Sequence, residues 1–312
     1  MAPEAQVAPR PRKMSVKSAL SWLVMIAAAV ALAFAANHHA HEIAETLRAV
    51  SVWPVLGAAA LHTVTLALRS EAWRIGLKAV GGQVPTPTIH RANAIAFLVG
   101  TIQGELSLPA RVAALRKAEP ERAPTAAQTA LVDAPLALVE LACLFAFTAL
   151  WEPWLIVGTI VIAIGLPFVA RRAASSRSGS PWLGLIVATD PVALRRLVVV
   201  MVLVVGFSAL RIWLILLAFD LPVDITSVAK VVAAVTLIGV LPLGLGTGPA
   251  ATIASLSTGE AALTTEGIAL TAGLAISATS VLGVVIYALA MAGWTARDAV
   301  RSRRSASAPG DG

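Results

Sequence analysis

The sequence is poor in charged residues, aromatic residues and cysteine. Only 13% of its 312 residues are charged and 5% are aromatic, whereas 58% are hydrophobic and the mean hydropathy is +0.82. Because about a quarter of the residues of an ordinary soluble domain are charged, the composition excludes that class and predicts a polytopic membrane protein. The single cysteine, Cys143, lies in an apolar run, which excludes a disulfide framework and a cysteine-based metal site.

Features of several enzyme and binding classes are also missing. No lysine directly follows a glycine, so the chain lacks the glycine-rich loop that holds the phosphates of ATP. Three histidines and Glu42 within residues 38–42 resemble a metal cluster, but on a short loop predicted outside the membrane a solvated role is preferred. We therefore predict no cofactor and no metal. The net charge of +7 fits cytoplasmic arginines that favour anionic lipid headgroups, and it does not imply nucleic acid binding.

Six apolar runs approach the length of about 20 residues that a helix needs to cross a bilayer. They lie at about residues 18–36, 50–68, 125–150, 153–170, 196–219 and 267–293. Two further apolar segments, about 89–117 and 228–257, are interrupted by glycine and proline. The sequence thus predicts an all-α integral membrane protein with about six full transmembrane helices and two re-entrant or broken helical hairpins. Eight full spans are the alternative, because glycine and proline are frequent in membrane helices.

A weak internal repeat relates the two broken segments. The triplets Trp-Arg-Ile around Arg74 and Leu-Arg-Ile around Arg211 are each followed by a proline eleven residues after the arginine, and each copy then breaks at glycines. The repeats are predicted at about residues 50–151 and 194–294, inside a membrane domain of residues 15–295. Apolar segments interrupted at corresponding places in two halves are typical of transporter sites built from broken helices.

The distribution of lysine and arginine predicts how the chain crosses the membrane. These residues are enriched in cytoplasmic segments, which places the N-terminal segment 1–14 and the basic tail 296–312 in the cytoplasm, both predicted as disordered. Basic clusters flank the first broken segment, and both stay inside only if that segment is a hairpin that re-enters from the cytoplasm. Acidic residues flank the second broken segment, which then enters from outside. The two halves become inverted repeats in a multi-pass protein of the cell membrane.

Charged side chains inside apolar segments are the candidate substrate-binding groups, since such charges usually face a cavity or a partner. Arg74 and Arg211 occupy equivalent places in the repeat. Both are candidates for contact with a phosphate, because a guanidinium stays ionised and offers a planar, bidentate set of donors. For Arg74 the alternative is an interfacial arginine at the inner end of its span.

The breaks themselves carry further candidates. Glu105 and Arg111 fall at the break of the first hairpin, where they either pair with each other or bind a headgroup. In the second hairpin, Gly244, Gly246 and Gly248 permit close backbone approach and expose amides that can hold an anion. Flexibility at a hairpin tip is the alternative explanation of these glycines.

Two carboxylates in the run at 125–150 complete the candidate set. Asp133 and Glu140 are seven residues apart, which places them on one face of a helix. Asp133 is either part of the site or a partner of Arg122 or Lys117 near the inner surface. Glu140 lies deeper, and we predict a substrate-binding or protonatable role for it.

Several of these motifs, taken in order, resemble one membrane protein family. They are Arg69 to Trp73, the Gly104-Glu105 pair followed by Arg111, the acidic stretch from Asp133 to Glu140, and the late Leu-Pro-Leu-Gly-Leu-Gly-Thr-Gly motif. In this pattern the chain is similar to the membrane region of lysylphosphatidylglycerol synthase/flippase proteins and their stand-alone flippase-like relatives, over roughly residues 15–295.

The resemblance implies movement of a lipid, or of a lipid-linked anionic headgroup, between leaflets. The soluble aminoacyl-transfer domain of the synthase relatives is not found after the last span, so we expect a transporter rather than an enzyme. Two alternatives stay open. One is a scaffold or partner subunit of a lipid-modifying enzyme, and the other is an intramembrane lipid transferase that uses Asp133, Glu140 or Glu105.

Overall fold

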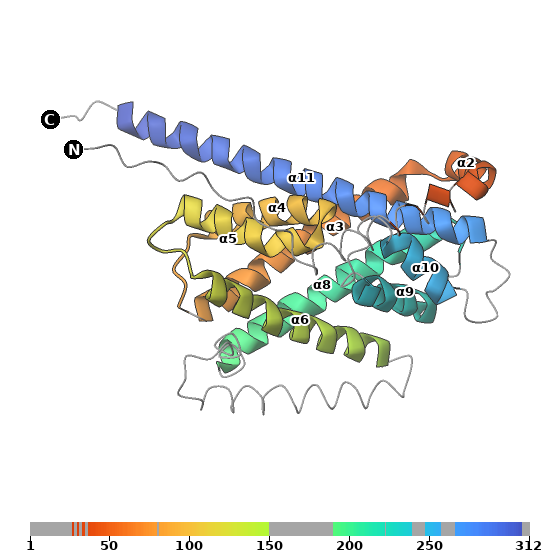
Figure 1. Ribbon diagram of the computed structural model, residues 1–312, viewed down its shortest axis with the longest axis horizontal. Coiled ribbons are helices and arrows are strands. Elements are labelled where there is room, and N and C mark those ends of the chain that lie inside the picture. The colour runs from red at the N-terminus through yellow and green to blue at the C-terminus, as the bar shows by residue number, and fades with distance from the viewer. Residues whose placement is uncertain are drawn as a thin grey trace, which may run out of the picture.

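The structure of the protein, a computed structural model, is all-helical in the part of the chain that it describes (Figure 1). The described residues are 27, 30, 33, 34, 37–79, 81–149, 190–221, 223–238, 247–256 and 266–307. Three helices are long and apolar enough to cross a membrane: Val52–Ala79, Pro191–Ala218 and Ile268–Arg297. The prediction of an all-α, multi-pass membrane protein is confirmed. Most of the predicted span at 18–36, and all of the one at 153–170, lie outside the described residues.

Two long helices, α3 (Val52–Ala79) and α8 (Pro191–Ala218), form the centre of the bundle. They lie side by side and run in opposite directions, as Figure 1 shows for the orange and green ribbons. Gly57 near the start of α3 lies against Leu214 near the end of α8, whereas Trp73 shares a cluster with Met201 nearer the start of α8. The first helices of the two predicted repeats are therefore antiparallel.

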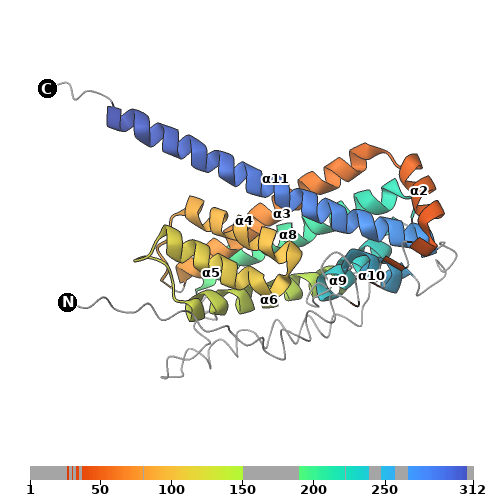
Figure 2. The ribbon, with the colours of Figure 1, turned by 45° about the horizontal axis from the view of Figure 1, so that its top comes forward.

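Each central helix is followed by a pair of short helices. After α3 come α4 (Thr86–Ile102), the 3-10 turn η1 (Gly104–Leu106) and α5 (Ser107–Ala118). The break predicted at Gly104-Glu105 is thus present, and α4 and α5 pack against each other (Figure 2). At about 1.5 Å per residue, the 12 residues of α5 extend only about 18 Å, well short of the roughly 30 Å hydrocarbon core.

The second pair consists of α9 (Ile225–Ile238) and α10 (Thr247–Leu256), which also pack against each other. With 14 and 10 residues, both are too short to cross the bilayer alone. Of the three glycines predicted to bind an anion, Gly244 and Gly246 lie outside the described residues, and Gly248 lies in the first turn of α10.

Local sequence signals fix the ends of the central helices. Gly81 adopts a left-handed backbone with φ of +84°, which glycine tolerates without a steric penalty. Its N–H donates to the carbonyl of Lys78 at 3.0 Å, and the N–H of Gly82 donates to that of Leu77 at 2.9 Å. This pair of bonds satisfies the last carbonyls of α3 and ends the helix.

Aspartates start α8 and α9. Asp190 accepts hydrogen bonds from two backbone amides of the first turn of α8, and Pro191 occupies the first helical position, where no N–H is needed. Asp224 accepts from the amide of Ser227 at 2.9 Å and from its hydroxyl at 2.6 Å. These two bonds hold the pKa of Asp224 below its ordinary value, because they stabilise the ionised carboxylate.

Three boundaries differ from the sequence-based expectation. The helix predicted to end at residue 68 continues to Ala79, and Arg69 lines a cavity and pairs with Glu140. The loop predicted before it is largely a helix, α2 (Ala40–Ala49). The tail predicted as disordered from residue 296 continues α11 (Glu266–Ser307), which extends beyond the bundle in Figures 1 and 2. By contrast, α6 (Ala126–Ala149) matches the predicted run.

Three apolar clusters of the described residues contact the central helices, and two of them lie on either side of a polar zone. One includes Ala58 and Ile215, and the other includes Trp73 and Met201. Polar residues of α3 occupy the stretch between these clusters, near the middle of the helix. The fold therefore places its buried polar groups at mid-depth along the spanning helices, where transporter sites are commonly built.

Candidate functional site

A cavity of about 540 Å³ lies in this polar zone. Six helices line it: α3, α4, α6, α8, α9 and α11. Its polar residues are His62, Thr65 and Arg69 of α3, Glu140 of α6, Ser208 and Arg211 of α8, Thr236 of α9 and Ser280 of α11. A volume of this size is typical of a site for a small ligand.

Arg211 is the most deeply placed charge of the cavity, with only 6% of its surface exposed. Its Nη1 donates to Nδ1 of His62 at 2.5 Å, and its Nη2 donates to the carbonyl of Ile276 at 3.1 Å and to Oγ of Ser280 at 2.9 Å. All of these acceptors are neutral. Within the described residues, Nε of Arg211 has no hydrogen-bond partner and no carboxylate is within ion-pair distance of the guanidinium.

The contact with Arg211 fixes the chemical state of His62. A guanidinium can only donate hydrogen bonds, so Nδ1 of His62 must be the acceptor and carry a lone pair. The imidazole is then neutral, with its proton on Nε2. On its other side the ring lies close to α11, because a Cβ at Gly283 would come within 2.8 Å of its Cδ2 atom.

The other charged residues of the cavity, Arg69 and Glu140, form an ion pair with each other. Only 17% of the Glu140 side chain is exposed, as against 41% of that of Arg69. Since the charges of this pair cancel, the described residues of the cavity leave the positive charge of Arg211 uncompensated. The lining is therefore suited to an anion.

A second cluster lies outside the cavity and joins α5, α3 and α6. Arg111 donates to Oδ1 of Asp133 at 2.7 Å, and the indole N–H of Trp73 donates to the same oxygen at 2.9 Å. The guanidinium of Arg111 also lies 5.0 Å from the centre of a Trp73 ring, which adds a cation–π contact. These interactions attach the second arm of the first hairpin to the central helices.

The partner of Asp133 is thus Arg111, neither Arg122 nor Lys117. One expectation for Arg111 was an ion pair with Glu105. The structure pairs Arg111 with Asp133, and the side chain of Glu105 is outside the described part of the structure. Asp133 and Glu140 both contact α3, which agrees with the prediction that they lie on one face of their helix.

Sequence comparison identifies the family. The family described as the lysylphosphatidylglycerol synthase TM region matches residues 16–292. The chain belongs to this family. The match covers every residue that lines the cavity, and it confirms the resemblance predicted for roughly residues 15–295. No single curated protein matches the chain.

In this member of the lysylphosphatidylglycerol synthase TM region family, the two arginines of the predicted repeat have different surroundings. Arg74 does not line the cavity. It forms an ion pair with Glu71 one turn earlier on α3, in which its Nε donates to a carboxylate oxygen at 2.6 Å. The placement of Arg211 in the cavity agrees with a candidate binding role, and that of Arg74 does not.

A hydrogen-bonded chain fastens α4 and α11 to α3 next to the cavity. Nδ1 of His90 lies 2.8 Å from the hydroxyl of Tyr287, which donates to Oγ of Ser70 at 2.8 Å. Ser70 donates in turn to the carbonyl of Leu66, a residue that lines the cavity. The first arm of the hairpin is therefore held at a defined position beside the polar zone.

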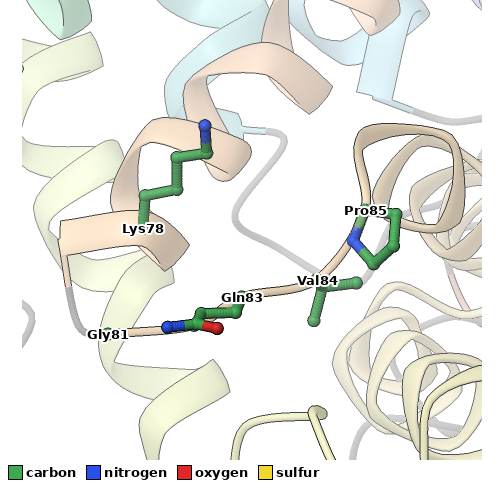
Figure 3. Close-up of a pocket in the computed structure, with 6 residues that line it drawn as sticks. Lys78, Gly81, Gln83, Val84 and Pro85 are labelled. Atoms are coloured by element: carbon green, nitrogen blue, oxygen red, sulfur yellow. The ribbon is translucent and has the colours of Figure 1, made fainter.

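Another hollow, of about 440 Å³, lies where α3 ends and is lined by Lys78 and residues 81–85. Figure 3 shows the Lys78 amine directed away from the side chain of Gln83 and from the chain between Gly81 and Pro85. The labelled groups do not converge on one point, so the central cavity of this family member is the better candidate site.

Sequence reasoning did not select His62, Arg69 or Ser280 as site residues. Arg69 follows a long apolar run, and this pattern is typical of a helix end. His62 and Ser280 are uncharged polar residues within largely apolar segments, and the packing of α3, α8 and α11 brings them to Arg211. The buried arginine was the one available signal, because its charge requires acceptors nearby.

Proposed function

We propose that the protein moves a phosphate-bearing lipid, or a lipid-linked headgroup of this kind, between the leaflets of the cell membrane. The observation that carries the proposal is Arg211, a buried cation in a central cavity with neutral acceptors only among the described residues. A buried charge without an opposite charge is strongly unfavourable. A phosphate oxygen supplies that charge and suits the planar donors of a guanidinium.

The family supports a lipid as the ligand. Its description names the synthesis of lysylphosphatidylglycerol, which is a phospholipid. The exposed faces of the spanning helices are apolar, with Val199, Val202, Leu203 and Leu289 among the exposed side chains, so lipid surrounds the cavity-bearing bundle.

We further propose that the hairpins α4–α5 and α9–α10 are re-entrant and that the two halves form an inverted repeat. The short helices and the antiparallel course of α3 and α8 support this arrangement. Helices that stop inside the bilayer next to a polar cavity are a common transporter plan. The proposed activity is transport without chemical change of the lipid.

Leaflet exchange in proteoliposomes tests the function. Vesicles with purified protein and a fluorescent phospholipid are treated with a membrane-impermeant quencher, and the rate at which inner-leaflet lipid becomes quenched is measured. We expect Arg211→Gln to lower this rate at least about tenfold, which corresponds to about 1.4 kcal/mol. Arg195→Gln, the same change at an exposed position of the same helix, should leave the rate unchanged.

The lipid recovered from the vesicles is then analysed by mass spectrometry. An unchanged lipid mass together with accelerated exchange supports transport. A changed lipid mass would point to an intramembrane transferase, and exchange no faster than in protein-free vesicles would point to a scaffold. Equal rates for wild type and Arg211→Gln would remove Arg211 from the site.

A further inference from the structure

We propose that His62 and Arg211 form a joint site for one oxyanion and one proton, in which His62 takes up a proton when a phosphodiester reaches Arg211. The inference rests on the proposed function and names the ion that accompanies the headgroup. It starts from the contact between Nη1 of Arg211 and Nδ1 of His62, which lie 2.5 Å apart on the wall of the cavity.

The contact between Arg211 and His62 requires a neutral His62. Protonation of Nδ1 would remove the lone pair that accepts from Arg211 and would place two cations side by side. Arg69 lines the same cavity from α3 and adds a further positive charge. These cations therefore disfavour a proton on His62 when no anion is bound.

An oxyanion reverses this preference. Nε of Arg211 is buried and has no hydrogen-bond partner among the described residues, so the guanidinium keeps one N–H that is not used within the protein. The negative charge of that ligand offsets the repulsion between Arg211 and a protonated His62. Since coupling between two ligands is reciprocal, the proton raises the affinity for the oxyanion by the same factor.

The groups that face His62 leave few other sites for this proton. Arg211 of α8 and Arg69 of α3 are cations, and Glu140 of α6 is already paired with Arg69. The residues that α4, α9 and α11 contribute to the cavity wall, such as Phe97, Thr236 and Ser280, are not titratable in the physiological range.

The step is a simple proton transfer. The lone pair of Nδ1 accepts a proton from a hydronium ion of the solvent, whose O–H bond breaks and leaves water. An N–H bond forms, and the hydrogen bond from Nη1 of Arg211 to Nδ1 breaks. His62 and Arg211 then each direct an N–H toward the oxyanion. When the oxyanion leaves, the proton returns to water and the original contact is restored.

Calorimetry of the purified full-length protein in detergent tests the proposal. The probe is dihexanoylphosphatidylglycerol below its critical micelle concentration, because its phosphodiester keeps one negative charge across the range of about pH 6 to 8 in which histidine titrates. Titrations in HEPES and in Tris, which differ in ionisation enthalpy, give the number of protons taken up per lipid bound.

For the wild type we expect proton uptake on binding, and an affinity that falls by up to about tenfold per pH unit as pH rises. His62→Asn retains an oxygen that can accept from Arg211 but cannot take up a proton. This variant should bind the lipid without proton uptake and with no dependence on pH. His90→Asn makes the same change at a histidine outside the cavity and should behave as the wild type.

Wild-type proton uptake in His62→Asn overturns the proposal, as does its loss in both variants. Lipid binding by the wild type without proton uptake overturns the proton site alone and leaves the proposed function standing. No binding by the wild type overturns both. If His62→Asn is not recovered as folded protein, His62→Gln replaces it, with the same expected and contradicting results.

Discussion

At the scale of single residues, the charges within the bundle differ in what balances them. Arg69, Arg74 and Arg111 each have a carboxylate partner, whereas Arg211 has neutral acceptors among the described residues. Ion pairs of the first kind are explained by stability alone. A buried cation without a carboxylate partner requires another explanation, such as an anionic ligand or a neighbouring residue whose protonation state changes.

Asp133→Ala tests the structural role of the cluster outside the cavity. The change leaves Arg111, which is only 8% exposed, without an anion and removes the acceptor of the Trp73 indole. Loss of one partner of a buried pair costs about 3 to 5 kcal/mol, and since 40% of the Asp133 side chain is exposed we expect about 2 to 3 kcal/mol. Thermal unfolding in detergent measures the loss.

Two further variants separate charge from shape at this position. Asp133→Asn keeps an oxygen acceptor for both donors and should lose less stability. Arg111→Met in the Asp133→Ala background removes the stranded cation and should recover part of the loss. A melting temperature equal to that of the wild type in Asp133→Ala alone would show that the pair does not stabilise the fold.

The sequence reveals buried charges more readily than their partners. Arg211 and Glu140 stand out because a charge in an apolar run is rare. Their contacts depend on residues far away in the chain, such as His62, and on the rotation of each helix about its axis. Periodicity along one helix specifies a face, as for Asp133 and Glu140, but it does not specify which residue of a distant helix meets that face.

At the scale of helices, the position of α11 against α3 determines the cavity wall. The two helices approach each other closely at Gly283, whose carbonyl accepts from the hydroxyl of Thr63 at 3.2 Å. Ser280, one turn earlier, contacts Arg211, and Tyr287, one turn later, contacts Ser70. A shift of α11 would therefore disturb the cavity and the neighbouring hydrogen-bonded chain together.

Gly283→Ala should produce such a shift. The added Cβ would lie 2.8 Å from Cδ2 of His62 and 3.0 Å from the carbonyl oxygen of Ala59, a backbone atom that cannot easily move. We expect a loss of about 1 to 3 kcal/mol in stability, as for other overpacked sites, and slower leaflet exchange. Gly293→Ala on the same helix is the control, because nothing lies within 4 Å of its Cβ position.

Thermal unfolding and the exchange assay measure both variants side by side. Equal behaviour of Gly283→Ala and Gly293→Ala would show that the close approach of α11 to α3 is not required.

The break of the first hairpin was predictable from the sequence, because glycine and the polar residues around it interrupt an apolar run. The importance of Gly283 was not, since glycine is common in membrane helices and only packing distinguishes one from another.

At the scale of the whole molecule, the proposed inverted repeat makes the two hairpins open to opposite sides of the membrane. In a Cys143→Ala background, single cysteines at Ala118 and Gly259 report the ends of the two hairpins. We expect an impermeant thiol reagent added to intact cells to label position 259 and not position 118, because basic residues keep the first hairpin on the cytoplasmic side.

Permeabilised cells serve as the control, in which both positions should react. Labelling of position 118 in intact cells would contradict the inner hairpin and the inverted repeat with it.

The number of spans, unlike the all-helical class, could not be fixed from hydropathy, because a broken segment has the same composition whether it crosses the membrane or returns.

The charge of Arg211, uncompensated among the described residues, has an electrical consequence. A membrane potential acts on each elementary charge with about 2.3 kcal/mol per 100 mV. A lipid phosphodiester brings one negative charge to the cavity, and the proton proposed to bind His62 brings one positive charge. The net charge of the cavity is then the same with the lipid and the proton bound as without them. The voltage across the membrane therefore acts equally on the protein with and without its bound lipid.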